Sequence, residues 1–273
     1  MSRIATRFRE LAGQGRTALV TDIVAGDPGP DMTVPMMHRL VADGADILEL
    51  GVPFSDPMSE GPVIQLAHER ALAQGTSLRG VLALVRQFRQ DDDETPVLLM
   101  GYANPVEHMG YEAFAEQAAS AGVDALLTVD LPPEEVSDVN ARLKAVGMDN
   151  ILLVAPTSPP ERVEKIVREA SGFIYYVSLK GVTGSGNLDV DAVREGVSGI
   201  RQHTELPVAV GFGIKDAASA RAVAAVADGV VVGSALVNRA AEAIAAGGDH
   251  AAAMDAVSDL LRELRQGVDS FAS

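Results

Sequence analysis

The chain alternates short apolar runs with longer segments in which apolar and polar positions follow a helical period. Continuous apolar runs of about four to eight residues are typical of buried strands, and apolar residues spaced three or four apart are typical of amphipathic helices. The predicted strands cover residues 18–24, 45–50, 96–100, 125–129, 150–154, 173–177, 206–210 and 229–232. The predicted helices cover residues 2–11, 32–42, 78–90, 111–121, 133–146, 159–170, 190–203, 216–227 and, as one or two helices, 235–266.

This alternation predicts an α/β protein. Roughly eight strand–helix units in a chain of 273 residues favour a (β/α)8 TIM barrel with an extra N-terminal helix. A doubly wound open sheet is compatible with the same alternation and is the alternative. Because no Pro/Ser-rich linker or shift in composition divides the chain, we expect a single domain over residues 1–273.

Composition and charge narrow the class of protein. Hydrophobic residues make up 47% of the chain, enough for a large core, and the formal net charge is −16. Such a charge disfavours binding to nucleic acid and to anionic membranes. Cys is absent, and residues 1–13 lack the apolar core of a signal peptide. We therefore expect a cytoplasmic protein without disulfides that binds neither nucleic acid nor membrane.

A barrel carries its active site on the loops that follow the C-terminal ends of its strands. Glu49 stands at such an end, and Asp56 and Glu60 follow it in a loop rich in Gly, Pro and Ser. A lone carboxylate at a strand end is most simply solvated, but three acids around one loop favour a site that pairs or uses them. The acidic run 91–94 precedes a strand, so we expect it at the opposite end of the barrel, as a solvated turn and not a metal site.

Glycine-rich segments follow three of the later strands, at 181–186, 211–214 and 232–235. The last two follow the seventh and eighth strands, where barrels commonly bind phosphate, and the helix that begins near Ser234 offers free N–H groups to an anion. Turns of this kind also use glycine for geometry alone, but the pair in this order favours a phosphorylated substrate. Residues 179–189 are further expected to form a lid that is mobile without ligand, with Lys180 as a tryptic site.

Other chemistries find little support in the sequence. The five histidines are scattered over predicted helices and their flanks without metal-ligand spacing, so we expect them on the surface and predict no metal site. No serine stands in a G-x-S-x-G elbow. Lys180 follows a strand, but its glycine-rich surroundings argue against the desolvation that activates a Schiff-base lysine. These observations favour carboxylate acid–base chemistry on a phosphate-bearing molecule.

A set of segments that runs in order over nearly the whole chain resembles the tryptophan synthase alpha subunit family. The segments are 48–61, 64–65, 100–105, 130–135, 181–184, 211–214 and 228–234. The resemblance implies a barrel that cleaves indole-3-glycerol phosphate to indole and glyceraldehyde 3-phosphate by a retro-aldol reaction in L-tryptophan biosynthesis. It also implies a beta subunit that carries pyridoxal phosphate as partner, in an alpha2-beta2 complex, and no cofactor in this chain.

The resemblance also implies roles for individual residues. Glu49 matches the family's general acid/base, which protonates indole C3, and Glu60 stands where the family has Asp, the carboxylate that accepts the indole N–H. Asp56 matches a loop residue that contacts the beta subunit. The other matches belong to the substrate site and are Asp22, Tyr175, Phe212, Gly184, Gly213, Gly233 and Ser234.

Two of these positions depart from the family pattern. Glu60 is one methylene longer than Asp, and a displacement of a catalytic carboxylate by ~1 Å can lower the rate roughly a hundredfold. Asp22 replaces an aromatic or apolar residue, and two acids in one pocket should raise the pKa of at least one of them and weaken the binding of an indole ring. The chain is therefore expected to be a working lyase or a weakly active alpha subunit that acts mainly as an allosteric and channelling partner. Another phosphate-binding barrel enzyme, such as a sugar-phosphate isomerase or aldolase, is the third interpretation.

Overall fold

The computed structural model describes residues 2–178, 189–211 and 213–270, and within them eight parallel strands close into a barrel. Each strand pairs with the next in sequence, and β1 also pairs with β8 through Ala18 and Gly229, which excludes the open sheet. The barrel prediction is thus confirmed. The strands are β1 Ala18–Val24, β2 Ile47–Gly51, β3 Val97–Gly101, β4 Ala125–Thr128, β5 Asp149–Val154, β6 Ile174–Val177, β7 Val208–Gly211 and β8 Gly229–Val232.

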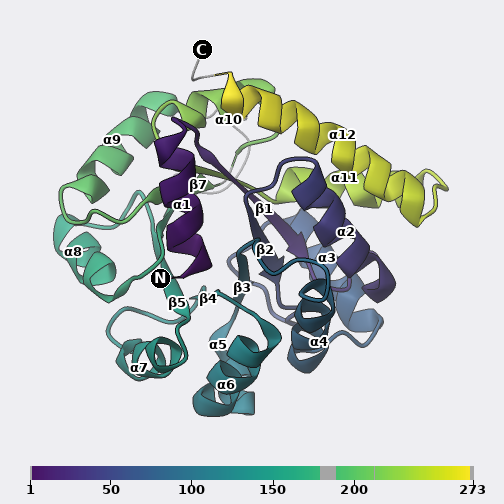
Figure 1. The fold of residues 1–273 in the computed structure, drawn as a ribbon, viewed down its shortest axis with the longest axis horizontal. Helices are drawn as coiled ribbons and strands as arrows, with labels where there is room; N and C mark the ends of the chain where they lie inside the picture. The colour runs from purple at the N-terminus through teal and green to yellow at the C-terminus, as the bar shows by residue number, and fades with distance from the viewer. Residues whose placement is uncertain (1, 179–188, 212, 271–273) are drawn as a thin grey trace.

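Helices surround the barrel and cover the outer face of its strands (Figure 1). They are α1 Arg3–Gly13, α2 Pro30–Ala42, α3 Pro62–Ala73, α4 Leu78–Phe88, α5 Ala103–Met109, α6 Tyr111–Ala121, α7 Ser137–Ala145, α8 Pro160–Glu169, α9 Val190–Arg201, α10 Ala217–Ala224, α11 Ser234–Ala245 and α12 His250–Asp269. Among the described residues, none of these helices combines the length and hydrophobicity needed to cross a bilayer.

The extra N-terminal helix closes one end of the barrel. Helix α1 lies across the ring of strands (Figure 1), and it buries Ile4, Phe8 and Leu11 against the side chains that fill the barrel interior. The ring of Phe8 lies 5.6 Å from that of Phe173. A ring pair at this separation is typical of aromatic packing in protein cores. With this end filled, the opposite end of the barrel is the one left for a site.

Two helices, α3 and α5, were not predicted. In α3 the apolar residues do not form one stripe, because Ile64, Ala67 and Ala71 are buried whereas Leu66 and Leu72 are exposed. A helix of this kind shows no clear 3.6-residue period. Helix α5 contains a proline and has only seven residues, which is too short to show the 3.6-residue period.

Candidate active site

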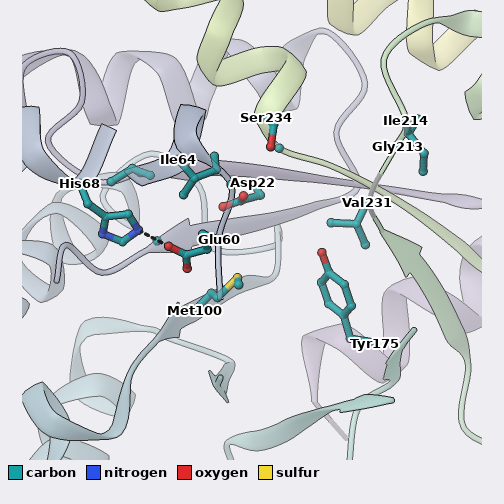
Figure 2. Close-up of a pocket in the computed structure, with 14 residues that line it drawn as sticks. Asp22, Glu60, Ile64, His68, Met100, Tyr175, Gly213, Ile214, Val231 and Ser234 are labelled. Carbon is teal, nitrogen blue, oxygen red and sulfur yellow. Dashed lines mark ion pairs between the residues drawn. The ribbon is translucent and has the colours of Figure 1, made fainter. Parts of the chain in front are cut away.

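A cavity opens at the C-terminal ends of the strands, the end at which barrel enzymes hold their substrates. Its apolar lining includes Ile64, Met100, Ile214 and Val231. The polar and glycine residues that line it are Asp22, Gly51, Glu60, Gly61, His68, Tyr175, Gly213, Gly233 and Ser234 (Figure 2). Apolar walls with a few converging polar groups are the usual composition of a small-molecule site. The structure therefore brings six of the predicted site residues together, namely Asp22, Glu60, Tyr175, Gly213, Gly233 and Ser234.

Glu49 is fully buried on β2, beside the cavity and not in its lining. Its exposed fraction is 0%, and within the described residues neither carboxyl oxygen has a hydrogen-bond partner. Burial, followed by the neighbouring Asp22 and Glu60, raises the pKa of Glu49 well above its usual value. The raised pKa favours the protonated acid, which can donate a proton. The alternative of a solvated acid at a strand end is wrong, because Glu49 is fully removed from solvent.

Asp22 lies in register with Glu49 on the adjacent strand β1. It fits against the backbone of Gly233, where a Cβ atom would lie 2.3 Å from its Oδ2, so a larger residue at 233 would displace it. Burial and the charge of Glu60 raise the pKa of Asp22 from 3.8 to about 7. This agrees with the expectation that neighbouring acids in this pocket raise one another's pKa.

Glu60 ends the loop after β2, and its partner is a histidine that the sequence had placed on the surface. His68, on α3, is only 2% exposed, so that expectation is wrong for this residue. Its Nε2 atom lies 2.9 Å from Glu60 Oε2 (Figure 2), although the N–H is not aligned well enough for a standard hydrogen bond. Since Ile64 and His68 are four residues apart on α3, both face the cavity. This spacing could have identified His68 only if α3 had been recognised as a helix.

Tyr175 projects from β6 with its hydroxyl directed toward the cavity (Figure 2). Its ring occupies space left by Gly211 on the neighbouring strand, where a Cβ atom would lie 2.4 Å from the tyrosine oxygen. Burial, with smaller effects of Glu49, Asp22 and Glu60, raises the pKa of Tyr175 well above its usual value. Tyr175 therefore remains a neutral hydroxyl that can donate a hydrogen bond.

The predicted phosphate cradle is described in part. Gly213 and Gly233 line the cavity, and Ser234 begins α11, whose first N–H groups have no partner within a helix. Gly213 has φ of +77°, a conformation that favours glycine. Gly184 and Phe212, and the expected lid with Lys180, lie outside the described residues.

The two remaining acidic features lie away from the cavity. Asp56 is exposed in the loop after β2, next to Met58, which is 82% exposed. The run 91–94 follows α4 and precedes β3, so it lies at the opposite end of the barrel, as expected. In this run the Asp92 carboxylate accepts hydrogen bonds from Thr95, and the Arg89 guanidinium donates one to the Asp92 carbonyl oxygen. Within the described residues no cluster of three or more His, Asp or Glu side chains could hold a metal ion.

Comparison with known proteins identifies the family. The model of the tryptophan synthase alpha chain family matches residues 8–268. Tryptophan synthase alpha chains from Thioalkalivibrio sulfidiphilus and Nitrosococcus oceani are 62% and 60% identical to this chain; the matches cover 98% and 99% of it and 100% and 98% of the relatives. The crystal structure of the alpha subunit from Legionella pneumophila superimposes with a TM-score of 0.91 at 45% identity, over 99% of each chain. The chain belongs to the tryptophan synthase alpha chain family.

Proposed function

We propose that Glu49 and Glu60 carry the lyase reaction of this alpha chain, the retro-aldol cleavage of indole-3-glycerol phosphate to indole and glyceraldehyde 3-phosphate. The observation that carries the proposal is the environment of Glu49. This glutamic acid is buried, has no hydrogen-bond partner among the described residues and has a pKa well above its usual value, beside a cavity with apolar walls. A general acid of this kind is what protonation of a carbon atom requires.

In the proposed mechanism one carboxyl group performs both proton transfers. The neutral Glu49 gives its proton to C3 of the indole ring, and the C–C bond to the glycerol chain breaks. The resulting Glu49 carboxylate takes the proton of the adjacent hydroxyl group, whose carbon becomes the aldehyde. Glu60 accepts the indole N–H and stabilises the positive charge that develops on the ring. One molecule of indole-3-glycerol phosphate thus gives one molecule of indole and one of glyceraldehyde 3-phosphate, and Glu49 returns to its acid form.

The phosphate of the substrate is proposed to bind at the turn before α11. Gly213 and Gly233 allow close approach of their backbone, and Ser234 adds a hydroxyl and the N-terminal end of the helix. Gly184 and Phe212 complete the site in this proposal through their match to the family. Tyr175 positions the substrate from the opposite side of the cavity. The reaction needs no cofactor from this chain, because the carboxyl groups supply the proton transfers.

The family implies a tryptophan synthase beta subunit as partner, which receives the indole. We propose an alpha2-beta2 complex with pyridoxal phosphate in the beta subunit. The contact is proposed to include the loop after β2, where Asp56 and Met58 are exposed on the same side as the mouth of the cavity. The cytoplasm is the proposed compartment, since the family belongs to amino-acid biosynthesis.

A weakly active alpha subunit is the second candidate, and Asp22 is the observation that favours it. Its carboxyl group occupies the cavity that the indole ring would enter, where an apolar side chain would pack better. Such a chain would act mainly by activating the beta subunit.

Release of glyceraldehyde 3-phosphate from indole-3-glycerol phosphate, measured with and without a beta subunit, decides between the candidates. Turnover in the complex at rates comparable with the beta reaction supports the lyase. Stimulation of the beta reaction without appreciable cleavage supports the second candidate. The absence of both cleavage and stimulation would overturn both candidates.

A further inference from the structure

His68 has both ring nitrogens engaged in the buried wall of the cavity. The backbone N–H of Phe54 donates to Nδ1 at 3.0 Å, and Nε2 lies 2.9 Å from Glu60 Oε2. Phe54 belongs to the loop after β2, and Glu60 is the penultimate residue before α3. A single imidazole therefore contacts the beginning and the end of the loop that carries Glu60.

The contact with Phe54 determines the tautomer of His68. Because Nδ1 accepts a hydrogen bond, it carries no proton, so the proton of the neutral ring is on Nε2. This places an N–H donor next to the Glu60 carboxylate. A second proton on Nδ1 would face the Phe54 N–H and break that bond.

Little else in the described part of the chain holds the Glu60 side chain. There, His68 Nε2 is the one basic nitrogen within ion-pair distance of its carboxylate. The backbone of the loop is better fixed: Gln65 Nε2 donates to the Glu60 carbonyl oxygen at 2.8 Å, and the Ser59 N–H donates to the Tyr102 hydroxyl at 3.1 Å. The main chain of Glu60 is thus anchored by other residues, and its carboxylate by His68.

We infer that His68 is a positioning residue for Glu60. Its Nε2 atom holds one carboxylate oxygen by a close polar contact at 2.9 Å and leaves the other for the substrate, and the hydrogen bond from Phe54 to its Nδ1 couples this orientation to the conformation of the loop. The inference rests on the proposed function, in which Glu60 accepts the indole N–H. In this arrangement the methylene that Glu60 has in addition to Asp lets its carboxylate reach the imidazole on α3.

Two substitutions separate the two contacts of His68. In His68→Asn the side-chain oxygen can replace Nδ1 as acceptor for Phe54, but no donor reaches Glu60. In His68→Gln the amide nitrogen can replace Nε2 as donor to Glu60. We expect kcat for cleavage to fall about a hundredfold in His68→Asn, the cost of a ~1 Å misplacement, with a much smaller change in KM, and to fall clearly less in His68→Gln.

His38→Asn is the matched control. His38 is a half-buried histidine on α2 whose ring packs on Phe88 at 4.6 Å, and it does not line the cavity. Its substitution removes an imidazole that packs on a core aromatic ring away from the cavity, and it is expected to leave kcat unchanged. Equal losses of kcat in His68→Asn and His68→Gln would overturn the inference, since a merely structural histidine would give that result.

Nitrogen NMR of histidine-labelled wild-type protein tests the same contact without turnover. We expect the resonances that vanish in His68→Gln to report a protonated Nε2 and an unprotonated Nδ1, and the Nε2 resonance to shift in Glu60→Gln. A protonated Nδ1, or no shift, would overturn the inference. If the wild-type protein does not cleave indole-3-glycerol phosphate, the proposed function and the positioning role fail together, whereas a failure confined to the His68 variants leaves the proposed function intact.

Discussion

Three carboxyl groups share one side of the cavity, and their surroundings differ. Burial beside two other acids raises the pKa of Glu49 well above its usual value, burial and Glu60 raise the pKa of Asp22 to about 7, and Glu60 lies against His68. Acids whose environments separate their pKa values can take different roles in one reaction. In the proposed mechanism Glu49 is the proton donor, and Glu60, beside the imidazole of His68, is the acceptor for the substrate N–H.

The raised pKa of Asp22 predicts how stability depends on pH. In the unfolded chain this carboxyl group loses its proton near pH 3.8, whereas in the folded protein it keeps the proton up to about pH 7. Between these values the unfolded state binds fewer protons, so stability falls as pH rises and is constant above that range. Asp22→Asn removes this contribution. We expect the decrease in Tm between pH 5 and pH 8 to be smaller in Asp22→Asn than in wild type.

Asp56→Asn is the control for this measurement, because Asp56 is exposed in the loop after β2. The pH dependence of Tm in Asp56→Asn should match that of wild type. Identical decreases in all three proteins would show that Asp22 is not held in the environment described. Glu49 contributes in the same direction, so a part of the decrease should persist in Asp22→Asn.

Asp22 also predicts an effect on catalysis. The side chain places a carboxyl group in the cavity that the indole ring would enter, so Asp22→Phe should improve the fit of an indole ring and raise kcat/KM for cleavage. A buried apolar side chain contributes about 1.5–3 kcal/mol, so an increase on the order of tenfold is expected. Steady-state cleavage in the presence of a beta subunit measures it. An unchanged or lower kcat/KM would mean that Asp22 has another role and would remove the support for a weakly active chain.

The site residues could be predicted to different degrees. Glu49 and Glu60 were predicted because their carboxylates stand at a strand end and in the loop after it. The burial of Asp22 against Gly233 could not be predicted, since it depends on how closely two nonadjacent segments approach. His68 was missed because its helix shows no apolar stripe, and a histidine without its partner in view is most simply placed on the surface.

At the level of the elements, one arrangement recurs at the N-terminal end of the barrel. Asp46, Asp124 and Asp228 each precede a strand and accept the N–H of a residue on the neighbouring strand, at 2.8 Å in all three cases. Each also binds an arginine from a helix, namely Arg265, Arg89 and Arg201. These contacts tie adjacent strands and the outer helices together, away from the active site.

The recurring arrangement gives a comparison of stability. Arg265 and Asp46 are more than 90% buried, whereas Arg201 and Asp228 are 45% and 40% exposed. Loss of a buried partner leaves an uncompensated charge, so Arg265→Met should lower the free energy of unfolding by about 3–5 kcal/mol. Arg201→Met should cost at most about 1 kcal/mol, because an exposed ion pair contributes little. Urea denaturation measures both, and equal losses would contradict the role assigned to burial.

The strands could be predicted because buried parallel strands are continuous apolar runs. Their order could be predicted as well, since strand–helix repetition leaves few topologies. Helices α3 and α5 could not be predicted, because α5 has only seven residues and α3 is apolar on two sides. Without α3 the prediction of the site was incomplete, because α3 carries His68 and part of the cavity wall.

In the whole molecule, the two ends of the barrel have separate tasks. One end is filled by α1 and tied by the Asp–Arg pairs, and the other holds the cavity, the acids and the turn before α11. A phosphorylated substrate must approach a chain with a net charge of −16. The raised pKa values of Glu49 and Asp22 lower the negative charge beside the cavity. The single-domain organisation over residues 1–273 stays a prediction.

Cleavage of indole-3-glycerol phosphate by wild type and by Glu49→Gln, in complex with a beta subunit, tests the account most directly. Gln keeps the shape of Glu49 and cannot give up a proton to carbon. We predict that wild type releases glyceraldehyde 3-phosphate and that Glu49→Gln is slower by ~10²–10⁴-fold or more, with the complex still formed. Near-normal turnover in Glu49→Gln, with the fold intact, would contradict the assignment of the buried carboxylic acid as the proton donor.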